Sequence, residues 1–202
     1  MAASSLIDFP DQFETDRLLI RAPRPGDGVA IDEAVRETLV ALRRWMDWAL
    51  PEPSVEISEA FARRGAADFA ARIDLPMLLW LKGGQTFVGS SGLHPHDWMV
   101  PRFEIGYWCR ARFEGQGYIS EAVRGISHFA FERLSARRLE IWCDACNERS
   151  ARVAERTGFQ LEGRLRNHML DTRGHLRDTL VFACLSSDEL RDAPAAKGRG
   201  QS

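Results

Sequence analysis

The sequence predicts one α/β domain built on a mixed, mostly antiparallel sheet that helices flank on its faces. Two long segments, 27–42 and 119–134, place apolar residues at helical spacing. Several short β-prone runs are joined by glycine-containing turns, which is typical of antiparallel hairpins. The length of 202 residues fits one domain better than two.

The first half of the chain is predicted to hold one strand, two helices and a hairpin. The run that begins at Glu14 reads as a short strand ended by prolines. Amphipathic helices are predicted over 27–42 and from 54 to about 73, because apolar residues recur there every three or four positions. The segments 77–81 and 86–93 flank a glycine-containing turn and predict a hairpin.

The second half is predicted to contain a strand, a long helix, a strand, a short helix and a hairpin: 103–109, 119–134, 138–143, 150–157, and 161–170 with 175–185. The apolar residues of the long helix fall on one stripe, the pattern of a helix packed on a sheet. No repeat or linker interrupts this order, so we expect a single domain over 14–187. Residues 1–13 are expected to be a flexible N-terminal segment, and 188–202 a C-terminal extension with a flexible tail.

Composition excludes several classes of protein. The chain has 27 Lys and Arg against 29 Asp and Glu, a net charge of −2, and so lacks the basic excess of proteins that bind nucleic acid. No apolar run approaches the roughly 18 residues that span a bilayer, so no membrane partner is expected. The N-terminus lacks the build of a signal peptide, and 4 cysteines are too few for a disulfide scaffold. We therefore expect a cytoplasmic protein.

The segment RFEGQGY, residues 112–118, lies between a predicted strand and the start of a predicted helix. A helix start offers unpaired N–H groups and partial positive charge, and glycines let the backbone approach a ligand, so such a segment can bind a pyrophosphate. No Gly-Lys-Ser/Thr follows, and Gly115 and Gly117 do not complete a three-glycine dinucleotide fingerprint. By itself the segment is a weak signal, because glycines in turns are usually structural.

An ordered set of motifs strengthens the signal from residues 112–118. The strand FEIGYW with Glu104, the RxxGxG loop, a helix beginning YISEAV, Asn147-x-x-Ser150 and the RTGF segment follow one another along the chain. Together they resemble the RimJ/RimL-type subgroup of the GNAT N-acetyltransferase superfamily over residues 14–185. The resemblance implies the GNAT acyl-CoA N-acyltransferase fold and an enzyme that transfers acetyl from acetyl-CoA to a primary amine.

The resemblance also implies a cofactor site. The backbone of Tyr107, Trp108 and Cys109 is expected to bond the pantetheine arm, and the N–H groups of the loop are expected to hold the pyrophosphate. The remaining cofactor-binding candidates are Arg112, Gly115, Gln116, Gly117, Tyr118, Asn147 and Ser150. For Arg112 the alternative is a surface salt bridge with Glu114.

Attack of an amine on a thioester needs a proton acceptor, an oxyanion donor and a proton for the leaving thiolate. Glu104 is the candidate base, acting through water on an α-amine whose pKa is about 7.7–8.0; its alternative is a surface pair with Arg102. The resemblance implies that Ser150 donates to the leaving sulfur, although Asn147 and Ser150 are also typical helix caps. A backbone N–H near Tyr107 or Trp108 is the candidate oxyanion donor. The tyrosine acid of some superfamily members has no apparent counterpart here, which leaves Ser150 or solvent.

The acceptor is less constrained by the sequence. Trp45 and Trp48, with Glu104, are candidate substrate-binding residues, although aromatic residues at that spacing also pack cores. A protein N-terminus, as in ribosomal-protein-alanine acetylation, competes with small amines such as polyamines, antibiotics or amino acids. A longer acyl donor and a non-catalytic acyl-CoA-binding module remain alternatives, and the resemblance implies a homodimer.

No metal site is predicted. Cys143 and Cys146 form one CxxC without a second ligand pair, a pattern too sparse for structural zinc. His94 and His96 flank a proline and are interpreted as loop residues; the alternatives are a metal site and the lining of an acceptor cleft.

Overall fold

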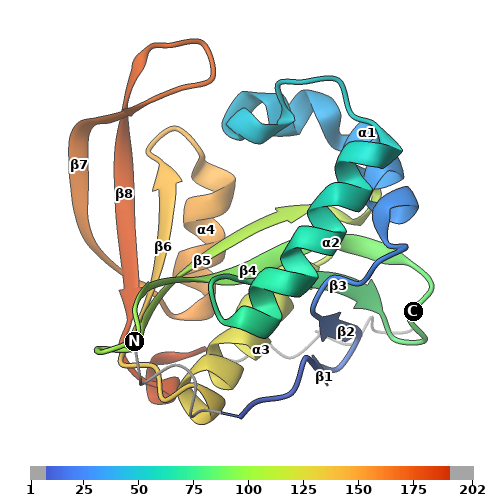
Figure 1. The fold of residues 1–202 in the computed structure, drawn as a ribbon. Coiled ribbons are helices and arrows are strands. Elements are labelled where there is room, and N and C mark those ends of the chain that lie inside the picture. The colour runs from blue at the N-terminus through green and yellow to red at the C-terminus, as the bar shows by residue number, and fades with distance from the viewer. Residues whose placement is uncertain (1–7, 192–202) are drawn as a thin grey trace, which may run out of the picture.

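The computed structural model describes residues 8–191, so residues 1–7 of the expected N-terminal segment and 192–202 of the expected C-terminal extension lie outside the described residues. Its sheet has eight strands in the order β1-β2-β3-β4-β5-β6-β8-β7. The strands are β1 (Gln12–Glu14), β2 (Leu18–Arg21), β3 (Leu75–Leu81), β4 (Phe87–Asp97), β5 (Arg102–Cys109), β6 (Arg138–Asp144), β7 (Gln160–Leu170) and β8 (Leu176–Cys184). The helices are α1 (Gly28–Trp45), α2 (Val55–Ala71), α3 (Tyr118–Arg133) and α4 (Glu148–Thr157). The predicted α/β class is confirmed (Figure 1).

All neighbouring strands are antiparallel except β5 and β6. These two pair in parallel over three positions only, ending at Glu104 opposite Glu140. Beyond that position the two strands have no ladder between them, although β5 continues to Cys109 and β6 to Asp144. The sheet is therefore mostly antiparallel, as predicted, with a gap at its centre.

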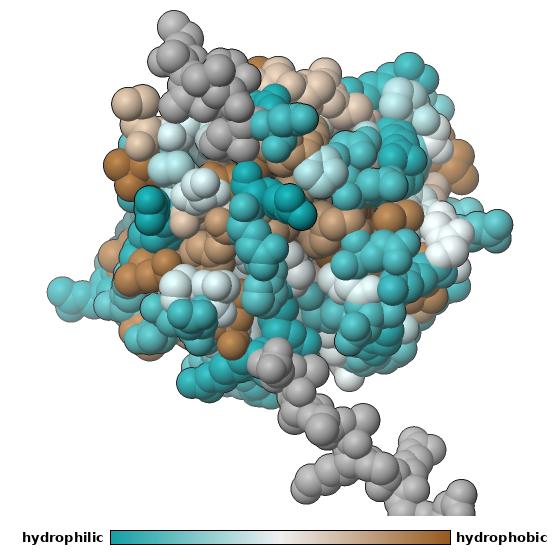
Figure 2. Space-filling model, turned by 90° about the horizontal axis from the view of Figure 1, so that it is seen from below, coloured by the Kyte–Doolittle hydropathy of each residue, from teal (hydrophilic) through white to brown (hydrophobic). Residues whose placement is uncertain are grey.

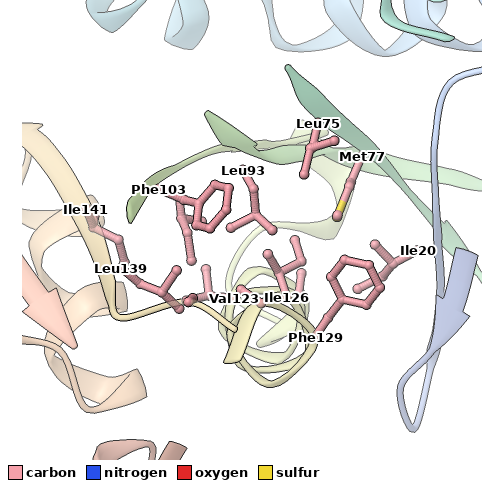
Figure 3. Packing of buried hydrophobic residues seen from close by; sticks show 14 of the residues in the cluster. Ile20, Leu75, Met77, Leu93, Phe103, Val123, Ile126, Phe129, Leu139 and Ile141 are labelled. Carbon is pink, nitrogen blue, oxygen red and sulfur yellow. The ribbon is translucent and has the colours of Figure 1, made fainter. Parts of the chain in front are cut away.

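Two hydrophobic clusters lie on opposite faces of the sheet. Strand residues alternate between faces, so Met77 and Leu79 belong to one cluster while Leu78 and Trp80 belong to the other. The first cluster includes Val123, Ile126 and Phe129 of α3, which point toward the sheet in Figure 3. The second holds the buried residues of α1, with Ala62 of α2. Helices α3 and α1 thus fix the sheet from its two sides.

The folded part of the chain begins before Glu14, contrary to the predicted boundary. Strand β1 starts at Gln12, and the Phe13 ring stacks on Phe129 of α3 with 4.8 Å between centroids. At the other end, a 3-10 helix, η4 (Ser187–Glu189), lies against α3, and the N–H of Arg191 donates to the carbonyl of Thr157 at the end of α4. These tertiary contacts are not visible in local composition, which made both segments look loose.

Three smaller predictions need correction. Helix α1 runs to Trp45, so Trp45 lies in the helix rather than in the connection after it. Helix α4 begins at Glu148, and Ser150 therefore lies in its first turn instead of preceding it. His94 and His96 belong to strand β4 and not to a loop, because β5 keeps pairing with this part of β4, with His94 opposite Glu104.

The surface is mixed in character. The molecule seen from below presents mainly hydrophilic residues with apolar areas between them (Figure 2). Among residues 8–191 no helix combines the length and apolar character needed to cross a bilayer.

Candidate active site

The central gap between β5 and β6 opens into a cavity of about 300 Å³. Tyr107, Trp108 and Cys109 of β5 line it, together with the N-terminal turns of α3 and α4. Because β5 has no ladder to β6 here, its backbone N–H and C=O groups on that edge are available to another extended chain. The three residues predicted to bond a pantetheine arm therefore lie where such an arm could pair with them.

The loop before α3 provides the second part of this cavity. Gly115 and Gly117 both have positive φ, +73° and +82°, and Gly117 is the N-cap of α3. A Cβ added at Gly115 would meet nothing within 4 Å, so the backbone borders open space. Gly115, Gly117 and Tyr118 line the cavity at the point where the first turn of α3 presents its free N–H groups. This arrangement fits a pyrophosphate, and the role of these residues in binding one stays a prediction.

A hydrogen bond inside the cavity joins β5 to α4. The hydroxyl of Tyr107 lies 3.0 Å from Oγ of Ser150 and 3.1 Å from the Ser150 carbonyl. Burial raises the pKa of Tyr107, against the lowering effect of its bond with Ser150. The helix is capped by Asn147 alone, whose Oδ1 accepts from the N–H of Ser150 at 3.2 Å. The Ser150 hydroxyl is therefore not used as a cap and faces the cavity with Tyr107.

A second cavity, of about 650 Å³, lies on the α1 and α2 face of the sheet. Its wall is largely aromatic and aliphatic and includes Trp48, Phe61, Leu78 and Phe87. Met46, Tyr107 and Trp108 line both cavities, so the two spaces meet at the end of β5. Trp48 belongs to this second space, with its ring 6.1 Å from that of Trp108, whereas Trp45 lines the first.

The acetyltransferase (GNAT) domain model matches residues 17–160. The chain is a GNAT acetyltransferase. The relative named "Putative ribosomal N-acetyltransferase YdaF" of Bacillus subtilis (strain 168) is 28% identical over 174 residues, covering 86% of this chain and 93% of the relative. The resemblance found in the sequence is thereby confirmed.

Solved structures agree on the fold. The microcin C7 self-immunity acetyltransferase MccE, in complex with acetyl-CoA and AMP, has a TM-score of 0.81 and 20% identity, covering 88% of this chain and 98% of that one. RimL, the ribosomal L7/L12 alpha-N-protein acetyltransferase in complex with coenzyme A, has a TM-score of 0.79 and 22% identity, covering 86% of this chain and 96% of that one. The fold thus accommodates acetyl-CoA or CoA in its solved neighbours.

In this acetyltransferase the Arg112 side chain is bonded to Glu37 and not to Glu114. Its Nε lies 2.9 and 3.0 Å from the two carboxylate oxygens of Glu37 on α1, while Glu114 pairs with Arg149 at 2.8 Å. The hydrogen bond from Arg112, aided by Arg110 and opposed by burial, lowers the pKa of Glu37 to about 2. Arg112 therefore ties the loop to α1, and the predicted alternative partner Glu114 is wrong.

Three arginines of α4 were not singled out from the sequence although they line the first cavity: Arg149, Arg152 and Arg156. Arg152 pairs with Glu148 at 2.6 Å, and Arg156 has no ion pair within residues 8–191. Their spacing of three and four residues places them on one helix face, and this spacing is a signal that sequence reasoning could have used. Two of the three are paired with carboxylates, so Arg156 and the loop N–H groups contribute the positive charge at the mouth of the cavity.

Glu104 lies on β5 at the end of the parallel ladder, outside the residues that line either cavity. Its nearest basic partner is Nε2 of His96, 3.5 Å from Oε2, and not the expected Arg102. Burial raises the pKa of Glu104, His94 and His96 lower it, and Glu140 raises it further. The carboxyl group is thus a stronger base than an exposed glutamate when it is ionised.

The cysteines show no sign of a metal or redox centre in the described part of the chain. Cys143 is buried, Cys146 is exposed, and all four cysteines are free. Residues 8–191 contain no group of three His, Cys, Asp or Glu side chains placed to hold a metal ion. Cys109 lines the first cavity, and burial raises the pKa of its thiol to about 12, which keeps it neutral.

Proposed function

We propose that this acetyltransferase modifies the N-terminal amine of a protein, with acetyl-CoA as donor. The observation that carries the proposal is the meeting of two cavities at Tyr107 and Trp108. One cavity fits a pantetheine and pyrophosphate, and the other, on the opposite face of the sheet, is large enough to receive the end of a chain. The names of the relative YdaF and the neighbour RimL support a ribosomal protein as acceptor.

The residues of this chain divide the work as follows. Acetyl-CoA supplies an acyl group activated as a thioester. The N–H groups of residues 115–118 hold its phosphates, and Tyr107, Trp108 and Cys109 bond its arm through their backbone. The hydroxyl of Ser150, bonded to that of Tyr107, holds a proton for the departing sulfur.

The acceptor side is assigned from the second cavity. Trp48 and Trp108 contact the acceptor there, and Trp45 closes the first cavity beside the same junction. Glu104 acts on the acceptor through water, because it lies two residues from Gly106, on the same face of β5, without lining the cavity itself.

The test is an acceptor panel with acetyl-CoA, read by mass spectrometry and thiol release. We expect acetylation at the N-terminal amine of short peptides, with polyamines, amino acids and aminoglycosides modified far more slowly. Modification of a small amine with every peptide left unmodified would refute the protein acceptor. Binding of acetyl-CoA without transfer to any amine would favour the non-catalytic alternative instead.

We also infer a cytoplasmic homodimer. The outer strand of the sheet is β7, and Leu161, Leu165 and Met169 on it are exposed. An exposed edge with apolar side chains favours pairing with a second copy. Sedimentation equilibrium should show twice the chain mass of 22.8 kDa, and replacing Leu165 with lysine should shift the protein toward monomer. A wild-type monomer at micromolar concentration would contradict this.

A further inference from the structure

An imidazole–carboxylate pair lies in the wall of the second cavity. Nδ1 of His94, on β4, is 2.7 Å from Oδ1 of Asp74, which directly precedes β3. Both residues line the cavity, and their side chains are 46% and 36% exposed. They are the only His–Asp pair with both members in that wall among residues 8–191.

The pair leaves one nitrogen free. When Nδ1 carries the ring proton and donates a hydrogen bond to Asp74, the neutral ring presents a lone pair at Nε2. Nε2 has no hydrogen-bond partner within residues 8–191, and it lies over Gly106: a Cβ there would be 3.2 Å from it. Gly106 also lines the cavity and directly precedes Tyr107, where the two cavities meet.

The charged groups around His94 favour its protonated form. Burial lowers its pKa, but the hydrogen bond and charge of Asp74 and the charge of Glu104 outweigh burial and raise it. Glu104 is its register partner on β5, and His96 lies two residues along β4. Arg64 of α2 and Glu52 before α2 line the same cavity and complete the set of charges facing it.

We propose that His94, oriented by Asp74, binds the acceptor amine and takes its proton, a role that rests on the acetyl transfer proposed above. Nε2 accepts a proton from the ammonium group, whose nitrogen lone pair then forms the N–C bond to the acetyl carbon as the C–S bond breaks. The thiolate takes the proton held by Ser150. The second proton of the acylated nitrogen passes through water to restore the Ser150 hydroxyl, and the imidazolium returns the first proton to solvent. Asp74 is a positioning residue that fixes the tautomer and stabilises the imidazolium.

The test compares four variants with the wild type over a range of pH. His94→Gln and Asp74→Asn change the pair. His128→Gln and Glu132→Gln change a second imidazole–carboxylate pair, on the exposed side of α3, with 3.7 Å between Nδ1 and Oε1. His94→Gln should lower kcat/KM for the amine by about 100-fold, while acetyl-CoA binding by calorimetry stays unchanged. The two α3 variants should match the wild type.

The pH profile separates catalysis from packing. Wild-type kcat/KM should fall as the pH drops through the raised pKa of His94, because the imidazolium cannot accept a proton. Asp74→Asn removes the charge that raises this pKa. The acidic limb of its kcat/KM profile should therefore move to lower pH, and the plateau value of kcat/KM should be lower than that of the wild type. His94→Gln should lose that limb. NMR titration of the His94 ring in the resting protein should show the same shift in Asp74→Asn without any turnover.

Glu104→Gln tests whether the two groups share one proton path. If they do, the double variant with His94→Gln should be no slower than the worse single variant. A His94→Gln protein that transfers acetyl as fast as His128→Gln overturns the role of His94 and leaves the proposed function standing. A wild type that acetylates no amine overturns the proposed function first, and the role of His94 with it.

Discussion

Valine at Gly115 or Gly117 should weaken acetyl-CoA binding at least 100-fold, about 2.7 kcal/mol, while the protein stays folded. At Gly115 a side chain would fill open space that the phosphates need, and at Gly117 it would cover the start of α3. Positive φ at both positions adds strain of about 1 kcal/mol to each valine variant. Isothermal titration with acetyl-CoA and a thermal melt measure the two effects separately.

The matched control is Gly83→Val in the turn between β3 and β4. Gly83 has φ +94° and nothing within 4 Å of its added Cβ, so this variant carries similar strain far from the cavity. It should lose a similar amount of stability and keep full affinity. Equal affinities for Gly83→Val and Gly115→Val would show that the loop does not hold the phosphates.

Removal of the Tyr107 or Ser150 hydroxyl should lower kcat about 100-fold with little change in acetyl-CoA affinity. Each hydroxyl is one half of the 3.0 Å bond that faces the first cavity, so losing either breaks the same source of the proton. Tyr107→Phe, Ser150→Ala and the double variant should therefore have similar rates. Pre-steady-state measurement of thiol release reports on this step.

Thr157→Val on the same helix is the control for a missing hydroxyl. The Thr157 hydroxyl donates within α4, to carbonyls at 2.9 and 3.0 Å, and lines neither cavity. This variant should lose some stability and keep its kcat. If the Tyr107→Phe and Ser150→Ala effects multiply in the double variant, the two hydroxyls act independently and the shared-proton role is wrong.

Local features of the sequence were sufficient to predict much of this site. Gly115 and Gly117 could be placed before a helix because the apolar stripe of α3 is periodic and the preceding strand is β-prone. The order of the motifs from Glu104 to the RTGF segment was enough to predict the GNAT fold, since each motif depends mainly on neighbours in sequence. Segment boundaries were less secure, as β4 shows: its extension through His94 and His96 depends on pairing with β5.

The hydrogen-bond partners of these side chains could not be predicted from local sequence. Arg112 bonds Glu37, which is 75 positions away, and Tyr107 reaches Ser150 across 43 positions. Asp74 and His94 are 20 positions apart and meet because β3 and β4 pair antiparallel. Whether a side chain bonds a partner near or far in sequence depends on where the sheet register and the helix packing place the competing groups.

The sequence by itself determined the fold class and the loop that fits a pyrophosphate, because periodicity and glycine spacing are properties of the local chain. The family followed from the resemblance of its ordered motifs to those of the GNAT superfamily. The tertiary structure alone decided which polar groups face a cavity. It joined Tyr107 to Ser150, since the gap between β5 and β6 exists only once the whole sheet has formed, and it directed Nε2 of His94 over Gly106 through the register of β4 with β5.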